Sequence, residues 1–221
     1  MEKFWLIDGP LLLTVVEAVR TLDSMKLPQQ RPTCKGGRST TFWGEIAPSE
    51  HLVQMCEDDS VVLDSLEGFV AGGLDAGEGV IVIATAAHLT ALADRLTERG
   101  IDVSFAQGRD QYIALDAEEI LAKFMIGGWP DQELFEAVVI GLIGRARGGQ
   151  GRRVRAFGEM VAIMWGQGLN GATVRLERLW HALCHQQGFS LFCAYPKSGF
   201  TQNAEESIRE ICDAHSRVLA S

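Results

Sequence analysis

Residues 51–59 of the chain read His-Leu-Val-Gln-Met-Cys-Glu-Asp-Asp. Residues 52–56 predict a short buried strand, and residues 60–71 predict an amphipathic helix because their apolar side chains recur at helical spacing. A strand, a tight turn and a helix form the layout of a phosphate-binding loop, but such a loop requires glycines and a lysine. The turn here is Glu57-Asp58-Asp59, whose carboxylates repel a triphosphate unless a metal ion intervenes. We therefore expect no ordinary nucleotide site at this turn.

The same acidic turn suits the start of a helix, where carboxylates can accept hydrogen bonds from free backbone N–H groups. We expect Asp59 to be the residue that caps the helix. Glu57 and Asp58 remain candidates for contact with a ligand or a metal ion.

Strand and helix patterns alternate along the rest of the chain. Val80-Ile-Val-Ile-Ala-Thr85 is an unbroken apolar run typical of a strand that is buried on both faces. Further strands are predicted at 112–115, 153–157 and 189–195, and helices at 88–99, 117–126, 131–147 (with Asp131 as its N-cap), 160–165, 172–185 and 205–219. This alternation predicts an α/β fold, a three-layer arrangement with helices on both faces of a parallel sheet.

Residues 1–45 differ from this pattern. Residues 10–25 predict one helix with an apolar stripe, and residues 27–41 predict a linker rich in proline, glycine and polar side chains. An apolar stripe must be buried, either on its own domain or on another subunit. We expect residues 1–45 to form a dimer or transmission element, and residues 46–221 to form the α/β domain.

Composition excludes several classes of protein. The chain has 221 residues, 47% of them hydrophobic and 22% charged, as in ordinary globular proteins. Its net charge of −9 argues against direct binding to nucleic acid. No apolar run approaches the ~20 residues of a membrane span, so we expect a cytoplasmic protein with reduced cysteines. The arginines at 145–155 are interpreted as a solvated loop in preference to a patch for an acidic partner.

The predicted strand ends define a candidate ligand site. In open parallel sheets, ligands bind beyond the carboxyl ends of the strands. Glu159 is the foremost candidate, because it directly follows a buried strand and desolvation there can perturb a carboxyl group. Capping of the next helix, or pairing with an arginine, is an equally weighted alternative for Glu159. The residues expected at this edge are Glu57, Asp58, Asp59, Thr85, His88, Asp116, Glu159 and Tyr195.

A second group of residues carries metal-ligating side chains towards the C-terminus. His181, Cys184 and His185 share one face of a predicted helix, since residues three and four apart are neighbours on a helix. Together with Cys212 and His215 they form a weak candidate for a metal or redox site. Burial in the core is the favoured interpretation of these residues, and Cys193 is expected only to pack inside its strand. We expect no metal and no cofactor.

Six segments of the sequence resemble the MEDS domain, a sensory domain of methanogens, methylotrophs and the repressor DcmR. They are HLVQMCEDD (51–59), GEGVIVIATAAH (77–88), FMIGGWPD (124–131), RVRAFGEMVAIMW (153–165), LERLWHAL (176–183) and FSLFCAYP (189–196). The resemblance implies a core similar to KaiC and RecA ATPases that lacks their phosphate-binding lysine, in agreement with the acidic turn. Met55-Cys56 departs from the Phe-Tyr pair expected in the first segment.

The resemblance implies a non-catalytic sensory domain that binds a small-molecule effector. Such domains usually work beside histidine kinases or transcription regulators, so a partner of either kind is expected. The sequence shows no pairing of nucleophile and base that would indicate an enzyme. Two alternatives stay open: a metal-assisted nucleotide binder that holds a divalent ion with Glu57, Asp58 and Glu159, and a redox or metal sensor built on cysteine and histidine.

Overall fold

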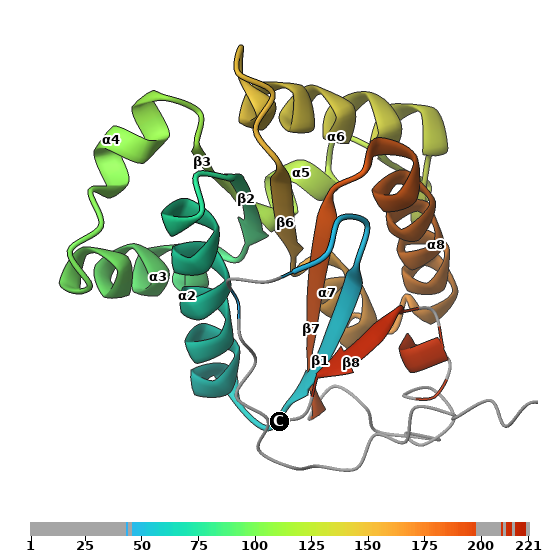
Figure 1. Ribbon diagram of the computed structural model, residues 1–221. Helices are drawn as coiled ribbons and strands as arrows, with labels where there is room; N and C mark the ends of the chain where they lie inside the picture. The colour runs from blue at the N-terminus through green and yellow to red at the C-terminus, as the bar shows by residue number, and fades with distance from the viewer. Residues whose placement is uncertain (1–42, 44–45, 198–208, 210, 214, 220–221) are drawn as a thin grey trace, which may run out of the picture. The chain divides into compact units, whose positions relative to one another are not determined.

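Short apolar runs of the chain form one six-stranded parallel sheet in the computed structural model (Figure 1). The structure describes residues 43, 46–197, 209, 211–213 and 215–219. The strands are β1 (His51–Cys56), β2 (Gly79–Ala84), β3 (Tyr112–Asp116), β6 (Val154–Gly158), β7 (Ser190–Pro196) and β8 (Arg217–Leu219). Their order across the sheet is β3-β2-β6-β7-β1-β8. Nearly every residue of the inner strands is buried, as expected for a parallel sheet covered on both faces.

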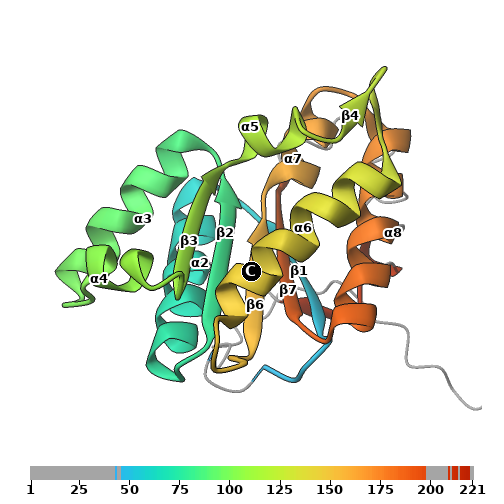
Figure 2. The ribbon, with the colours of Figure 1, turned by 90° about the horizontal axis from the view of Figure 1, so that it is seen from above.

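Helices cover both faces of the sheet (Figures 1 and 2). On one face lie α2 (Asp59–Asp75), α3 (Ala86–Glu98) and α4 (Val103–Gly108), and on the other lie α5 (Ala117–Leu121), α6 (Gln132–Arg147), α7 (Met160–Gly166) and α8 (Asn170–Gln187). The domain has two hydrophobic cores, one on each face of the sheet, and alternate residues of each strand pack into one or the other. In β2, for example, Val80 and Val82 pack under α2 and α3, while Ile81 and Ile83 pack under α5 and α6. The predicted α/β fold with helices on both faces is confirmed.

Two predicted helices extend too far towards the C-terminus. The helix predicted over 117–126 ends at Leu121, and the chain then forms a short antiparallel hairpin of β4 (Met125–Ile126) and β5 (Trp129–Pro130). Gly127 and Gly128 both adopt positive φ angles at the turn of this hairpin, which glycine tolerates best. The helix predicted over 205–219 is confirmed at the described residues 209 and 211–213, but it is wrong at Arg217–Leu219, which pairs with β1 as the sixth strand.

The predicted N-cap of α6 is confirmed, since the Asp131 carboxylate accepts a hydrogen bond from the backbone N–H of Leu134 at 3.0 Å. The predicted helix at 10–25 and the linker at 27–41 lie outside the described residues. None of the described helices has the length and the apolar character needed to cross a membrane.

The five arginines at 145–155 all contact other residues of the domain, but only Arg155 is buried. Arg155 lies within β6 and is 1% exposed, so the interpretation of this stretch as a solvated loop is wrong at that position. Its Nε donates to Glu78 Oε2 at 2.5 Å, and its Nη1 donates to the Phe69 carbonyl oxygen at 3.0 Å. The other four arginines contact Asp110, the Gln187 carbonyl, the Ala146 carbonyl and the Ile46 carbonyl, respectively.

The strand order creates a switch point between β2 and β6. The chain leaves β2 through α3 and α4 towards β3, and it leaves β6 through α7 and α8 towards β7. These connections run in opposite directions and on opposite faces of the sheet. Ligands of open α/β sheets bind at such points, beyond the carboxyl ends of the two strands.

Candidate functional site

Glu159 joins the carboxyl ends of β2 and β6. It directly follows β6, and its backbone N–H donates to the carbonyl oxygen of Ile83, in β2, at 2.9 Å. Its side chain turns back across the same gap, where Oε2 accepts a hydrogen bond from the Thr85 N–H at 2.8 Å and Oε1 lies 2.8 Å from His88 Nδ1. Glu159 precedes α7 but makes no capping hydrogen bond with its side chain. Glu159 thus occupies the N-cap position of α7 as predicted, but its carboxylate does not make the cap, and no arginine among the described residues pairs with it.

The contact with Glu159 changes the chemistry of His88. His88 lies in the first turn of α3, where the Thr85 hydroxyl accepts a hydrogen bond from its backbone N–H at 3.3 Å. The Glu159 carboxylate raises the pKa of the His88 imidazole above its usual 6.5, and partial burial opposes this shift. Asp59 Oδ2 lies 4.0 Å from His88 Nε2 and adds a smaller contribution of the same sign.

We call Asp59, Thr85, His88 and Glu159 the strand-end group. The side chains of His88 and Glu159 are each 12% exposed, while that of Asp59 is 79% exposed. The group therefore lies at the boundary between the domain and solvent. It offers carboxylate oxygens and one imidazole, but no lysine or arginine, so its chemistry favours an uncharged or cationic ligand over an anionic one.

The other residues predicted at this edge do not join the strand-end group. Asp58, and not Asp59 as predicted, caps α2 by accepting hydrogen bonds from the N–H groups of Ser60 at 2.9 Å and Val61 at 3.2 Å. The Ser60 hydroxyl adds a bond of 2.6 Å, and these contacts lower the pKa of the Asp58 carboxyl. Glu57 forms an ion pair with Lys197, beyond the ends of β1 and β7.

The side chains of Asp116 and Tyr195 have other partners than the strand-end group, although Asp116 lies at the expected edge, where it pairs with Ala84. Asp116 caps α5 and accepts hydrogen bonds from the N–H groups of Glu118 and Glu119. Tyr195 is fully buried in the core beneath α8, and its hydroxyl donates a hydrogen bond to Glu177 Oε1. Tyr195 lies near the carboxyl end of β7 as expected, but its side chain contacts Glu177 in the core and not the strand-end group.

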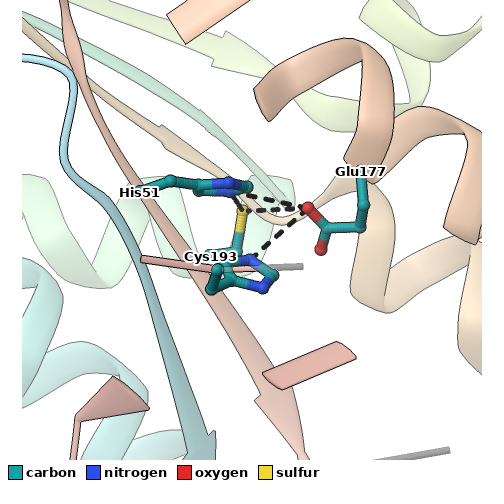
Figure 3. A group of neighbouring side chains, drawn as sticks. His51, Glu177 and Cys193 are labelled. Carbon is teal, nitrogen blue, oxygen red and sulfur yellow. Dashed lines mark hydrogen bonds and ion pairs between the residues drawn. The ribbon is translucent and has the colours of Figure 1, made fainter. Parts of the chain in front are cut away.

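A second constellation lies in the core between the sheet and α8 (Figure 3). One nitrogen, oxygen or sulfur atom from each of its four residues lies within 4.8 Å of the others. We call it the buried His–Glu–Cys group, which consists of His51, Glu177, Cys193 and His215. His51 begins β1, Glu177 lies on α8, and Cys193 lies within β7. His215 lies two residues before the start of β8. All four are buried.

Distances within this group are short. Glu177 Oε2 lies 3.5 Å from Nε2 of His51 and 3.5 Å from Nε2 of His215. Cys193 Sγ lies 3.5 Å from His51 Nε2 and 3.9 Å from Glu177 Oε2. Burial lowers the pKa of His51 to about 2, with a further contribution from His215. Burial also raises the pKa of the Cys193 thiol well above its usual 9.0.

The five residues predicted as a weak metal site do not converge. Only His215 belongs to the buried His–Glu–Cys group. Cys184 donates instead to the Phe189 carbonyl oxygen at 2.9 Å, and burial raises its pKa to about 12. The ring of His181 lies 4.5 Å from that of His185 and 5.8 Å from that of His51. Cys212 is buried in the core beside α8.

Sequence reasoning missed His51 and Glu177, although both leave a signal. Glu177 shares the buried face of α8 with Thr173, Trp180 and Cys184, at helical spacings of three, four and seven residues. A carboxylate on an otherwise apolar helix face requires a buried partner. His51 alternates with Val53 and Met55 on the same face of β1, where a polar side chain also requires a partner.

The carboxylates expected to hold a divalent ion for nucleotide binding are not assembled. Glu57 pairs with Lys197, Asp58 caps α2, and Glu159 binds Thr85 and His88. Among the residues that the structure describes, the one cluster suited to a metal ion is the buried His–Glu–Cys group.

In a comparison with protein families, residues 50–216 match the methanogen/methylotroph, DcmR sensory (MEDS) domain. The chain belongs to the MEDS family. The match covers most of the chain and contains every described strand except β8 (Arg217–Leu219). No match was found among curated proteins. MEDS is a sensory domain family, which is consistent with a sensory or regulatory role for this chain. The expected likeness of this MEDS domain to KaiC and RecA stays a prediction.

Proposed function

We propose that this MEDS domain is a non-catalytic sensor that binds a small-molecule effector at the strand-end group. The observation that carries the proposal is the Glu159 carboxylate, held between the Thr85 N–H and the His88 imidazole at the switch point of the sheet. The Glu159 carboxylate follows β6 and is held in place by Thr85 and His88, which follow β2, so its position is set without a ligand. Preorganisation of this kind lowers the cost of binding.

The effector that fits this site is small, uncharged or cationic, and carries an N–H or O–H donor. Glu159 and Asp59 supply acceptor oxygens, and His88, whose pKa is raised by Glu159, is the one basic side chain of the group, so two carboxylates face a single imidazole. An anionic effector would face repulsion from both carboxylates. Short-chain amines and alcohols therefore represent the proposed class, and short-chain carboxylates represent the class that is excluded.

Binding would act on a partner through the two chain segments that leave the switch point in opposite directions. These are α3 with α4, after β2, and α7 with α8, after β6. An effector can shift a conformational equilibrium only as far as its affinities for the two states differ. A contact with Glu159 changes the partners of Thr85 and His88, and so the start of α3 relative to the end of β6. We propose that this change is relayed to a histidine kinase or a transcription regulator.

A thermal-shift titration tests the proposed site. We expect members of the amine and alcohol classes to raise the unfolding midpoint of the wild-type chain saturably, with no rise from carboxylates. Glu159→Gln should abolish the response, because it removes the charge but keeps an oxygen for the Thr85 N–H. Glu98→Gln, an exposed position at the end of the same helix as His88, is the matched control and should respond like the wild type.

Two outcomes would contradict the proposal. One is the absence of a saturable shift with any amine or alcohol, and the other is an unchanged response in Glu159→Gln. Calorimetric titration with ATP and Mg²⁺ tests the alternative function, a metal-assisted nucleotide binder with enzymatic activity. Heat of binding together with ATP hydrolysis would favour that alternative over a non-catalytic sensor.

We also propose that the chain forms a homodimer through residues 1–45. The proposal rests on the apolar stripe of residues 10–25, which must be buried somewhere. Light scattering of the full chain, compared with a Val16→Asp variant at the centre of that stripe, should show a dimer and a monomer, respectively. Equal masses for the two proteins would contradict this assembly.

A further inference from the structure

We propose that the buried His–Glu–Cys group is a binding site for one divalent transition-metal ion, and for Zn²⁺ in preference to Mg²⁺ or Ca²⁺. The inference concerns the core beneath α8 and is independent of the proposed effector site. It involves a ligand set that differs from the one predicted from sequence spacing.

The first argument is the geometry of the four ligand atoms. Four ligands at zinc-bonding distances of about 2.0–2.3 Å lie about 3.3–3.6 Å from one another in a tetrahedron. The separations of Glu177 Oε2 from the two histidine nitrogens are both 3.5 Å. The separations from Cys193 Sγ are 3.5 Å to His51 and 3.9 Å to Glu177. Four of the six separations are thus close to the edge lengths of a metal-centred tetrahedron, and the other two, from His215 to His51 and to Cys193, are within 4.8 Å.

The second argument is the proton arrangement of His215. Its Nδ1 lies 2.7 Å from the carbonyl oxygen of Ile211, so Nδ1 carries the proton that is donated there. Nε2 of the neutral ring then presents a lone pair to Glu177 Oε2 at 3.5 Å, and Nε2 is buried without a hydrogen-bond partner among the described residues. Two acceptors that face each other require a cation between them, or a second proton on the ring. A backbone carbonyl that orients the outer nitrogen is also the usual support for a metal-bound histidine.

The third argument is charge. A carboxylate, a thiolate and two neutral imidazoles balance a divalent cation, so the occupied site has no net charge. Burial of a charged group is costly unless it is paired. On binding, the Cys193 sulfur loses its proton to solvent and forms the metal–sulfur bond, which makes metal affinity dependent on pH.

The identity of the ion follows from the donor atoms. One sulfur and two imidazole nitrogens favour zinc and its neighbours over magnesium or calcium, which prefer oxygen ligands. Four protein ligands leave no open position, which is typical of a structural site and not of a catalytic one. The Tyr195 hydroxyl binds the second oxygen of Glu177 and would orient that carboxylate for the metal.

Occupancy of the site would join elements that are distant in the sequence. The ligands come from β1, α8, β7 and the residues that lead into β8. A bound ion would therefore fasten the edge of the sheet to α8. We expect the unfolding midpoint of the chain to rise with Zn²⁺ and to fall when a strong chelator removes it.

Cobalt substitution tests the site directly. The full chain, stripped of metal and free of any histidine tag, is titrated with Co²⁺. We expect visible bands of tetrahedral cobalt and a near-ultraviolet band of thiolate-to-cobalt charge transfer, both saturating at one equivalent. Zn²⁺ should displace the cobalt, and Mg²⁺ should not. Absence of the charge-transfer band in the wild type would overturn the proposal, and that measurement requires no variant to fold.

Variants assign the ligands. Cys193→Ser should lose the charge-transfer band, while Cys184→Ser, a buried thiol on the same side of the sheet, should keep it. His215→Gln should weaken Zn²⁺ binding by more than about 100-fold, since loss of an outer-shell partner alone costs about 10–100-fold. His181→Gln is the matched histidine control and should bind like the wild type. A band that survives in Cys193→Ser, or is lost in Cys184→Ser, would place the metal elsewhere and overturn the assignment.

Discussion

Oε1 of Glu159 lies 2.8 Å from Nδ1 of His88, so the residue that follows β6 is tied to the first turn of the helix that follows β2. The second oxygen of the same carboxylate accepts the Thr85 N–H. Two adjacent strands are thus connected at their carboxyl ends by one side chain, in addition to the hydrogen bonds of the sheet.

The contribution of His88 to stability should decrease as the pH rises. Because the folded state raises the pKa of His88 above 6.5, the folded protein binds the imidazole proton more tightly than the unfolded chain does. This contribution is complete below about pH 6.5 and is lost as the pH passes through the raised pKa of the folded state. Urea unfolding should show His88→Gln to be less stable than the wild type by about 1 kcal/mol at low pH, and by less at pH 9.

A Glu159→Gln background provides the control for this pH dependence. Without the carboxylate, His88→Gln should have a similar effect at both pH values. If the difference between the pH values persists in that background, another group is responsible for the raised pKa of His88.

Loss of the Glu78 charge should strongly destabilise the domain. Arg155 is fully buried, and Glu78 is the carboxylate that receives its Nε–H at 2.5 Å. Glu78→Gln leaves a buried guanidinium without a counter-ion, which should lower the free energy of unfolding by about 3–5 kcal/mol in chemical denaturation. Glu67→Gln, which removes a surface partner of Arg95 and Arg99, should cost no more than about 1 kcal/mol. Similar losses in the two variants would contradict the importance of the buried pair.

Gly79 should not tolerate a side chain. A Cβ atom at Gly79 would lie 2.3 Å from the carbonyl oxygen of Ala146, a backbone atom of α6 that cannot turn away. Gly79→Ala should therefore destabilise the domain by about 1–3 kcal/mol, measured by urea unfolding. Gly141→Ala in the middle of α6 meets open space and should stabilise by about 0.5–1 kcal/mol. Equal effects at the two positions would show that helix α6 does not pack on β2 as described.

The position of the α2 cap can be tested by alanine substitution. Asp58 accepts hydrogen bonds from two backbone N–H groups at the start of α2, whereas the Asp59 carboxylate points towards His88 at 4.0 Å. Asp58→Ala should lower the thermal unfolding midpoint, because it removes the cap. Asp59→Ala should lower it less, and Asp58→Asn should largely restore it. The reverse order would return the capping role to Asp59.

Much of the fold could be predicted because the decisive patterns are local. The apolar run of β2 and the helical spacing of α2 indicate their structures without reference to other segments. The helix at 117–126 is predicted too long because apolar residues continue up to Ile126, although Gly127 and Gly128 favour a hairpin turn. The strand β8 has three residues and is specified by its pairing with β1, which no local pattern reveals.

The candidate sites were harder to predict than the fold. Glu159, Thr85 and His88 could be placed together because the ends of parallel strands share one edge of the sheet. Glu177 and His51 lie 126 positions apart in the chain, and their contact depends on how α8 packs across the sheet. The spacing of residues within one helix pointed to His181 and Cys184 as metal ligands instead. Such spacing shows only which residues are neighbours on the same helix, and it carries no information about contacts with other elements.

The small size of β8 has a consequence for self-association. This strand ends the sheet with three residues, and no described residue pairs with its outer side. Unpaired outer strands can recruit strands of other molecules and initiate aggregation. Here the available template is short, and it begins with the exposed Arg217, which forms an ion pair with Glu50 at 3.2 Å. A short, charged strand of this kind disfavours the addition of a foreign strand at this edge of the described sheet.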